Sequence, residues 1–286
     1  MSLQLKQEPA PIKGTPFRVR RDKNEMLWSE FERGVWEPDT RLVFNRFIDA
    51  QHSYIDIGAW IGPTVLMGCP LAKCVYAIEP DPIAFPELVE NIASNRPLTD
   101  NVKLFNICIT PESGKKFFGS RGDGGDSMSS LLFSNGKTSW TVDGMNFEEW
   151  MEQNNIRDCS FIKIDIEGGE YSVIPTMSCY IKKHHPALYL SFHACFLGRE
   201  VRGFLAGVRR CVYRLNSTLE VLKALKTYKY VYNPRGKITK SGADTLPSRL
   251  HYRLARMSWK PIVLLLACLY GALGKTDSLV FSDQRW

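Results

Sequence analysis

The sequence has no two cysteines in a C-x-x-C spacing, although it contains eight cysteines. They are Cys69, Cys74, Cys108, Cys159, Cys179, Cys195, Cys211 and Cys268. Several lie in apolar runs, where a free thiol behaves as a small hydrophobic side chain. The scattered spacing disfavours both a zinc site and a disulfide framework, so we predict reduced cysteines in a cytoplasmic protein.

The sequence also lacks an apolar stretch near its start and a run long enough to span a bilayer. Residues 1–24 are polar, basic and contain prolines, which predicts a flexible arm and not a signal peptide. The apolar run 261–274 is shorter than the roughly 20 residues that a spanning helix needs. We expect it to form a buried or homodimer-forming helix. The alternative is an interfacial helix that contacts the inner face of a membrane through residues 248–275.

Negative charge is scarce in the last third of the chain. Residues 1–180 hold 18 Lys and Arg against 25 Asp and Glu, a net charge of −7. Residues 181–286 hold 19 against 5, a net charge of +14, and the two parts sum to the overall +7. The positive charge of residues 181–286 favours an anionic partner, such as lipid headgroups, nucleic acid or a phosphorylated substrate. The alternative is that these residues form a basic face that contacts only solvent.

From residue 53 onward, short β-branched runs alternate with longer helical segments, which predicts a parallel sheet with crossover helices. The predicted strands are Tyr54–Ile57, Cys74–Ile78, Val102–Ile107, Phe161–Ile164, Ala187–Ser191, Lys229–Tyr232 and Leu279–Phe281. The first five are apolar on both faces, as expected for strands covered by helices on each side.

Helices are predicted between these strands and before the first one. They are Pro82–Asn95, Asn146–Asn154, and one or two helices within Glu25–Ile48 that cover the N-terminal side. The glycine- and serine-rich segment Ser113–Asp143 reads as an unusually long loop, which is often functional.

The segment YIDIGAWIGPT ends the first strand and begins a helix. It places Asp56, Gly58 and Gly62 where glycines allow a sharp turn and a ligand can approach the helix N-terminus. No G-x-G-x-x-G pattern is present, and Trp60 follows Ala59 where a second glycine would stand. A pyrophosphate would meet this bulky side chain, so the loop suits a ligand without phosphates, such as S-adenosylmethionine.

The second strand ends in VYAIEP, with Glu79 at its carboxyl end. An acid at this position can accept hydrogen bonds from both hydroxyls of a ribose. The alternative is a carboxylate that caps the helix after Pro80. We favour ribose binding.

Acidic residues follow the fourth strand in FIKIDIEGGEYSVIP, and a histidine follows the fifth in LYLSFHACF. Asp165 and Glu167 leave the strand end, where ligands bind in open α/β sheets, while Glu170 can also cap the next helix. Their available roles are contact with an ammonium group, a general base on a hydroxyl, or a metal shell. We assign no metal ligand, and we place His193 at the same edge.

The chain resembles the FkbM-type methyltransferase family over about residues 34–197. The motifs that carry the resemblance are IDIGAWIGPT, VYAIEPDP with ELVENIASN, GDSMSSLL and IKIDIEGGE. The resemblance implies a class I methyltransferase (Rossmann-like) α/β fold: a mostly parallel seven-stranded sheet with helices on both faces. It divides the chain into the arm 1–24, the methyltransferase domain 25–235, a basic and apolar helical insertion 236–276, and the last strand 277–286.

The same resemblance implies O-methylation of a sugar, glycolipid or natural-product hydroxyl, with S-adenosylmethionine as the cofactor. We expect catalytic roles for Asp165, His193 and Glu167, with His193 or Asp165 as the base. Predicted cofactor contacts are Asp56, Gly58, Ala59, Gly62, Glu79, Pro80 and Asp165. Predicted acceptor contacts are Asp126, Ser127, Ser130 and Glu170.

Two departures from the family and two other readings remain open. Trp60 stands where many members carry Asn, and the chain from Arg199 onward is only loosely family-like, which leaves the acceptor undetermined. The other readings are a nucleotide-binding oxidoreductase and a binding module without turnover. Nucleic-acid methylation is disfavoured because no NPPY-like tetrad follows the fourth strand.

Overall fold

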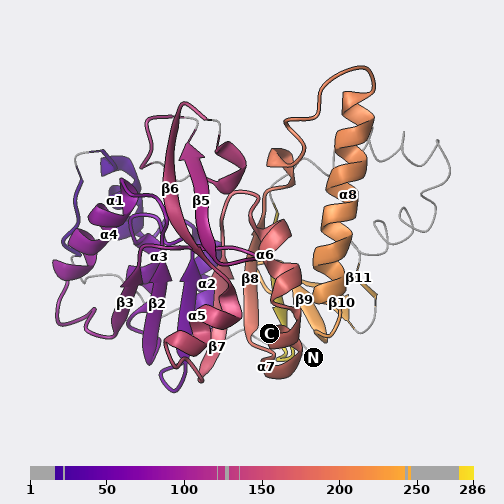
Figure 1. The fold of residues 1–286 in the computed structure, drawn as a ribbon. Coiled ribbons are helices and arrows are strands. Elements are labelled where there is room, and N and C mark those ends of the chain that lie inside the picture. The colour runs from indigo at the N-terminus through magenta and orange to yellow at the C-terminus, as the bar shows by residue number, and fades with distance from the viewer. Residues whose placement is uncertain are drawn as a thin grey trace.

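The structure is a computed structural model that describes residues 17–21, 23–120, 122–125, 129–134, 136–241, 244–245 and 277–286. A central sheet lies between two layers of helices (Figure 1). Its strands run in the order β11-β10-β9-β12-β8-β7-β1-β2-β3. Five neighbouring strands are parallel: β3 (Val102–Phe105), β2 (Cys74–Ile78), β1 (Ser53–Ile57), β7 (Cys159–Ile164) and β8 (Ala187–Phe192).

The last strand of the chain is inserted antiparallel into the sheet. β12 (Asp277–Ser282) pairs with β8 on one side and with β9 (Tyr230–Tyr232) on the other. These seven strands confirm the mostly parallel seven-stranded sheet. Two short strands, β10 (Ile238–Ser241) and β11 (Asp244–Thr245), extend its edge. The start of the predicted helical insertion 236–276 is therefore β-structure, while residues 246–276 lie outside the described part.

Helices cover both faces because the strand residues alternate between two apolar clusters. Ile55 and Ile57 belong to the cluster that packs against α5 (Phe147–Gln153), α6 (Glu170–Thr176), α7 (Ser178–His184) and α8 (Ala206–Ala224). Tyr54 belongs to the cluster on the opposite face, with α1 (Glu25–Arg33), α2 (Pro38–Phe47), α3 (Pro63–Gly68) and α4 (Ala84–Ala93). Strands buried on both faces require this two-sided cover.

Residues 17–21 pack on the domain, although the sequence places them in the flexible arm 1–24. Phe17 is buried, and its ring lies 5.7 Å from that of Phe31 on α1. The backbone N–H of Arg18 donates to Asn95, and that of Arg20 donates to Asn91 on α4. An apolar anchor and two side-chain amides thus hold the described end of the arm, which the polar composition did not reveal.

The predicted loop Ser113–Asp143 is instead largely a β-hairpin, so that prediction was wrong. β5 (Gly114–Ser120) pairs antiparallel with β6 (Thr138–Met145), and β6 pairs with β4 (Cys108–Ile109) in a second, three-stranded sheet. Between β5 and β6 lies the 3₁₀ turn η1 (Leu131–Phe133). The hairpin rises beyond the main sheet in Figure 1.

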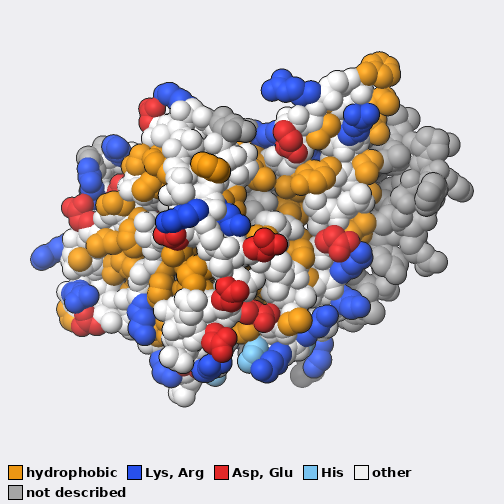
Figure 2. Space-filling view, viewed as in Figure 1, with side chains coloured by type: hydrophobic (Ala, Val, Ile, Leu, Met, Phe, Trp, Pro, Cys, Tyr) orange, Lys and Arg blue, Asp and Glu red, His pale blue; other side chains and the backbone are white. Residues whose placement is uncertain are grey.

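An apolar surface patch lies at the start of α8. Hydrophobic side chains gather where α8 begins (Figure 2), and Phe204 there is 93% exposed. Among the helices of the described part, none combines the length and apolarity needed to cross a membrane.

The seven described cysteines are free thiols, as predicted.

Candidate functional site

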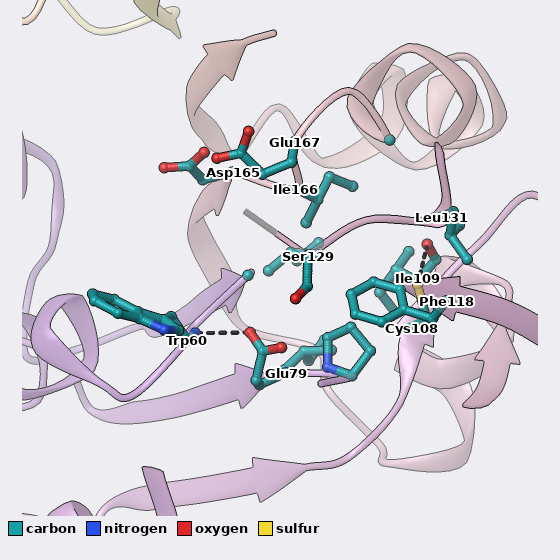
Figure 3. A pocket seen from close by; sticks show the side chains of 15 residues that line it. Trp60, Glu79, Cys108, Ile109, Phe118, Ser129, Leu131, Asp165, Ile166 and Glu167 are labelled. Atoms are coloured by element: carbon teal, nitrogen blue, oxygen red, sulfur yellow. Dashed lines mark hydrogen bonds between the residues drawn. The ribbon is translucent and has the colours of Figure 1, made fainter. Parts of the chain in front are cut away.

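A cleft opens at the carboxyl ends of β1, β2 and β7, and the hairpin side closes it. Its empty space amounts to about 560 Å³, which includes the open mouth. Figure 3 shows Asp165 and Glu167 on one side, apolar side chains on the other, and Glu79 below. Its lining is Ile57, Gly58, Trp60, Ile78, Glu79, Pro80, Cys108, Ile109, Phe118, Ser129, Leu131, Asp165, Ile166, Glu167 and Gly169.

The turn after β1 forms the floor of the cleft and requires a glycine at its first position. Gly58 has φ +90°, and a Cβ built there would lie 1.9 Å from the backbone oxygen of Asp165. Its N–H donates to the backbone oxygen of Ile78 at 3.0 Å. The loop therefore sits directly against the ends of both neighbouring strands, β2 and β7.

Trp60 links this turn to the hairpin side of the cleft. Its φ of 49° is left-handed, a conformation that Asn adopts far more readily than a bulky residue. The backbone N–H donates to Glu79, and the indole Nε1–H donates to the backbone oxygen of Gly125 at 2.9 Å. These two bonds hold Trp60 in its left-handed conformation.

Glu79 lies in the cleft with one backbone donor on each carboxylate oxygen. Trp60 N–H donates to Oε2 and Asp81 N–H donates to Oε1, both at 2.8 Å. Burial raises the pKa of Glu79 to about 7, although these two hydrogen bonds oppose the shift. Each carboxylate oxygen can accept two hydrogen bonds, so each can still accept one from a ligand hydroxyl.

Behind the cleft, a buried ion pair joins β1 to β7. Asp56 is fully buried, and Lys163 donates to it at 3.2 Å and to the backbone oxygen of Gly58 at 3.2 Å. Thr64 on α3 donates to the other oxygen of Asp56 at 2.6 Å. Burial lowers the pKa of Lys163, but nearby carboxylates, Asp56 foremost, outweigh it and raise that pKa. The pair therefore supports the turn from below.

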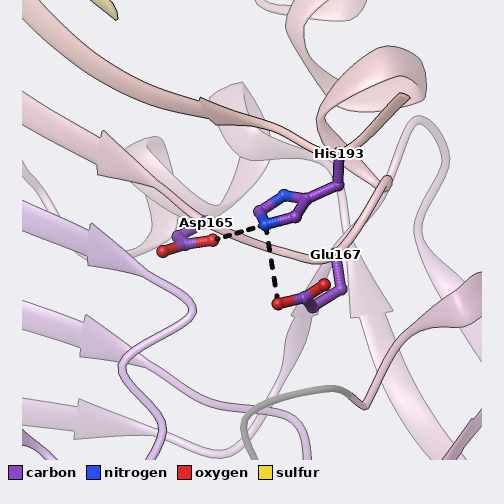
Figure 4. A group of neighbouring side chains, drawn as sticks. All are labelled: Asp165, Glu167 and His193. Carbon is purple, nitrogen blue, oxygen red and sulfur yellow. Dashed lines mark ion pairs between the residues drawn. The ribbon is translucent and has the colours of Figure 1, made fainter. Parts of the chain in front are cut away.

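Two carboxylates and an imidazole meet at one side of the cleft (Figure 4). Nε2 of His193 lies 3.6 Å from Oδ1 of Asp165 and 3.6 Å from Oε1 of Glu167. His193 follows β8, while the two acids follow β7, so adjacent parallel strands bring them together. We call these three residues the acid–histidine group.

Glu170 holds the acid–histidine group from behind. Its carboxylate accepts the N–H of His193 at 2.6 Å and the N–H of Gly168 at 2.9 Å, and Oε1 lies 3.5 Å from Nδ1 of His193. Burial lowers the pKa of His193, but Glu170, Asp165 and Glu167 outweigh it and raise that pKa to about 9. His193 is therefore mostly protonated at neutral pH without a ligand.

The hairpin is tied to the cleft through hydroxyl and carboxylate groups. Asp81 accepts hydrogen bonds from Ser129 Oγ at 2.6 Å and from Gly125 N–H at 3.0 Å. Ser130 Oγ donates to the backbone oxygen of Glu167 at 3.0 Å. The segment between β5 and β6 is thus bonded to the chain after β2, through Asp81, and to the chain after β7, through Glu167.

Residues 56–215, more than half of the 286 residues, match the methyltransferase FkbM domain. The match begins at β1 and includes the whole cleft, the hairpin and the acid–histidine group. The chain belongs to the FkbM methyltransferase family. Membership confirms the resemblance and counts against the oxidoreductase reading.

Solved structures with a similar arrangement include methyltransferase FkbM from Methylobacillus flagellatus KT, at 16% identity and a TM-score of 0.45. That comparison covers 92% of this chain, which spans 56% of the other chain's length. Another is precorrin-6y C5,15-methyltransferase from Geobacter metallireducens GS-15, at 13% identity and a TM-score of 0.37, covering 69% of this chain and 74% of that one. No match was found among curated proteins.

The FkbM domain brings part of the predicted cofactor set into the cleft. Gly58, Glu79, Pro80 and Asp165 line it, whereas Asp56, Ala59 and Gly62 do not. Asp56 instead bonds to Lys163 and Thr64, and the side chain of Ala59 packs in the core. The segment from Asp56 to Gly62 thus combines residues of the cleft wall with residues that support the turn.

The predicted acceptor contacts need correction. Glu170 is 0% exposed and bonds to backbone N–H groups, so it positions His193 and does not face an acceptor. Ser130 is also buried and bonds to the backbone of Glu167. Asp126 and Ser127 lie outside the described residues. The structure brings all three predicted catalytic residues together: Asp165, Glu167 and His193.

Sequence reasoning missed the apolar wall of the cleft. Cys108 and Ile109 form β4 beyond the end of β3, Phe118 lies on β5, and Leu131 begins η1. Cys108 and Ile109 could have been expected, because they follow a parallel strand toward the same sheet edge. Phe118 and Leu131 could not have been expected there, because the glycine- and serine-rich composition of their segment predicts a loop.

We expect Gly58→Ala to destabilise the fold and remove ligand binding. The added Cβ would collide with the backbone oxygen of Asp165 and would require φ +90° from an alanine. Such backbone strain costs about 1–3 kcal/mol before the collision is counted. Thermal unfolding would measure the loss, with Gly207→Ala as the control, because a Cβ at Gly207 meets nothing within 4 Å. Equal melting temperatures for the two variants would contradict this account.

Proposed function

We propose that this chain is an S-adenosylmethionine-dependent methyltransferase that transfers a methyl group to a hydroxyl of a sugar, glycolipid or natural product. The observation that supports it most is the arrangement of the cleft: an apolar wall, a buried carboxylate and an acid–histidine group follow one another. Membership of the FkbM methyltransferase family supports the reaction class.

The cleft residues fit each part of S-adenosylmethionine. Ile109, Phe118 and Leu131 offer an apolar wall for the adenine ring. Both oxygens of Glu79 retain an acceptor position for the two ribose hydroxyls. The methionine portion would lie along the turn at Gly58, next to the acid–histidine group. Trp60 crowds a pyrophosphate but not this phosphate-free ligand.

The acid–histidine group is also where an acceptor hydroxyl would be bound. S-adenosylmethionine supplies a methyl group on a positively charged sulfur. The protein must hold the acceptor oxygen in line with that carbon and remove its proton. Asp165 and Glu167 are partly exposed to the cleft, with 30% and 15% of their side chains accessible. We assign them to the acceptor oxygen, while His193, held by Glu170, orients them.

Donor binding should weaken as the pH falls below about 7. Glu79 accepts both ribose hydroxyls only when ionised, and burial raises its pKa to about 7 in the free protein. Protonation competes with binding, so the affinity for S-adenosylhomocysteine should fall by up to about tenfold per pH unit below 7 and level off above it. Calorimetry from pH 6 to 8 would measure this. Glu79→Gln should show a flat profile, and an equally steep profile in that variant would refute the assignment.

Methyl transfer itself is tested with S-adenosylmethionine carrying a ¹³C-labelled methyl group. The purified full chain would be incubated with a panel of hydroxylated acceptors, glycolipids and sugars first. The proposal expects a new O-methyl resonance in the product. Label that appears only on nitrogen or carbon would contradict hydroxyl transfer, although it would keep the methyltransferase class.

A further inference from the structure

We infer that the acid–histidine group is a binding site for a divalent cation of the Mn²⁺ type. Oδ1 of Asp165, Oε1 of Glu167 and Nε2 of His193 come from the ends of two adjacent strands. One ligand atom from each of the three residues lies within 4.8 Å of the others. Figure 4 shows both acids directed toward the same ring nitrogen.

His193 provides an observation that is independent of the acids. Its side chain is 9% exposed, and its Nε2 points into the gap between two carboxylates at 3.6 Å each. That distance is beyond a hydrogen bond. Its Nδ1 is buried as well and faces Oε1 of Glu170 at 3.5 Å, without a shorter hydrogen bond. A buried imidazole that makes no short bond, yet is aimed at two carboxylates, leaves room for an atom between them.

The surroundings of His193 are those of a metal-ligating histidine. Such a histidine almost always directs its second ring nitrogen at a carboxylate or carbonyl, which fixes the ring. Glu170 occupies this place: its Oε1 lies 3.5 Å from Nδ1, and it also binds the backbone N–H of His193. Because Glu170 is fully buried, it holds the ring orientation without competing for a cation in the cleft.

Charge in this region also favours a cation. Asp165, Glu167 and Glu170 surround one imidazole, and Lys163 approaches only the second oxygen of Asp165, at 3.8 Å. Lys163 is itself paired with buried Asp56 at 3.2 Å. A metal-ligating imidazole must be neutral. The four carboxylates Asp56, Asp165, Glu167 and Glu170 then face a single positive charge, on Lys163, and a divalent cation would offset two of the three excess negative charges.

The distances admit a small cation, and the ligand types favour Mn²⁺. Ligand atoms about 2.1–2.3 Å from a cation lie roughly 3 Å apart when adjacent and somewhat over 4 Å apart when opposite. The 3.6 Å separations therefore need to contract by only a few tenths of an ångström. Carboxylate oxygens suit Mg²⁺ and Mn²⁺, whereas imidazole nitrogen suits first-row transition metals. Mn²⁺ accepts both.

A cation at this position would face the cleft with open coordination positions. Three protein ligands leave room for water and for oxygens of an acceptor. This role rests on the proposed methyl transfer: the cation would hold the acceptor hydroxyl beside Asp165 and favour loss of its proton. It defines the acceptor class as one with two neighbouring oxygens that can chelate, such as a vicinal diol.

The test is Mn²⁺ binding to the full chain, followed by electron paramagnetic resonance, which detects free Mn²⁺. Wild-type protein should bind one Mn²⁺ per chain. Glu167→Gln and His193→Gln should each weaken binding at least about tenfold, because loss of a direct ligand should cost at least as much as loss of an outer-shell partner. Glu152→Gln, which removes an exposed acid of α5, is the matched control and should bind as the wild type does. Circular dichroism would verify that each variant folds.

Three results would overturn the site: no bound Mn²⁺ at millimolar concentration, unaltered binding in Glu167→Gln, or loss of bound Mn²⁺ when S-adenosylhomocysteine is added. The last would mean that the group receives the ammonium of the donor. Titration with S-adenosylhomocysteine alone separates the two proposals. Mn²⁺ binding without donor binding would keep the site and refute the proposed function, and the reverse would do the opposite.

Discussion

Glu79→Ala is expected to weaken the binding of S-adenosylmethionine by at least about 100-fold. A hydrogen bond to a charged group contributes about 1.5–3 kcal/mol, and Glu79 is positioned to accept two from the ribose. Loss of both therefore corresponds to at least about 3 kcal/mol, or a factor of roughly 100 in affinity. The substitution also releases the N–H groups of Trp60 and Asp81, which loosens the wall of the cleft. Calorimetry would measure the change.

The matched control is Glu87→Ala, which removes another buried acid. Glu87 lies on α4 and accepts a hydrogen bond from Asn24, away from the cleft. Its removal can lower the melting temperature but should leave the donor affinity within about threefold of wild type. If both variants lost affinity equally, the effect would come from a weakened fold and the ribose assignment would fail.

His193→Gln is expected to lower the rate of methyl transfer by about 100-fold or more, while the affinity for S-adenosylhomocysteine changes little. The imidazole contacts both acids of the acid–histidine group but does not line the cleft wall that surrounds the donor. Because His193 orients the two acids toward the acceptor oxygen, its loss would misplace them, and a misplacement of about 1 Å can cost roughly 100-fold in rate. Single-turnover transfer of the labelled methyl group would measure it.

His184→Gln is the matched control for that experiment. His184 is an exposed histidine of α7 that stacks on Tyr180, with ring centroids 4.6 Å apart. Its replacement should leave the transfer rate unaltered. A rate for His193→Gln close to that of this control would remove His193 from the mechanism.

The main sheet could be predicted from the sequence because its strands are buried on both faces. Cys74–Ile78 is a continuous apolar run, and Ser53–Ile57 is apolar except for Ser53 and Asp56. The predicted strands lie within one residue of these two. The Asn146 cap of α5 was equally readable, since its side chain accepts the N–H groups of Glu148 and Glu149. Local chemistry sufficed wherever an element had a strong apolar pattern or a capping residue.

The elements that were missed have a weak apolar pattern. α8 buries only Leu215, Thr218, Val221 and Ala224, about one residue per turn, so its helical period is faint. β5 and β6 mix exposed and buried residues, and they contain glycine and serine. The pairing of β6 with β5 and β4 stabilises them, and that tertiary context cannot be read from the segment itself.

The candidate site was predictable at the level of strands but not of side-chain direction. The sequence places Asp165, Glu167 and His193 at one sheet edge, and the structure brings them together. The sequence does not show that Asp56 and Glu170 turn away from the cleft. Their direction depends on buried partners elsewhere in the chain: Lys163 for Asp56, and backbone N–H groups for Glu170.

Calorimetric titration of the wild-type protein with S-adenosylmethionine and with S-adenosylhomocysteine tests the central claim most directly. The account predicts one site per chain for each compound, and NADH as a comparison should show no binding because Trp60 crowds a pyrophosphate. A folded protein that binds neither compound would contradict the assignment of the cleft as a methyl-donor site.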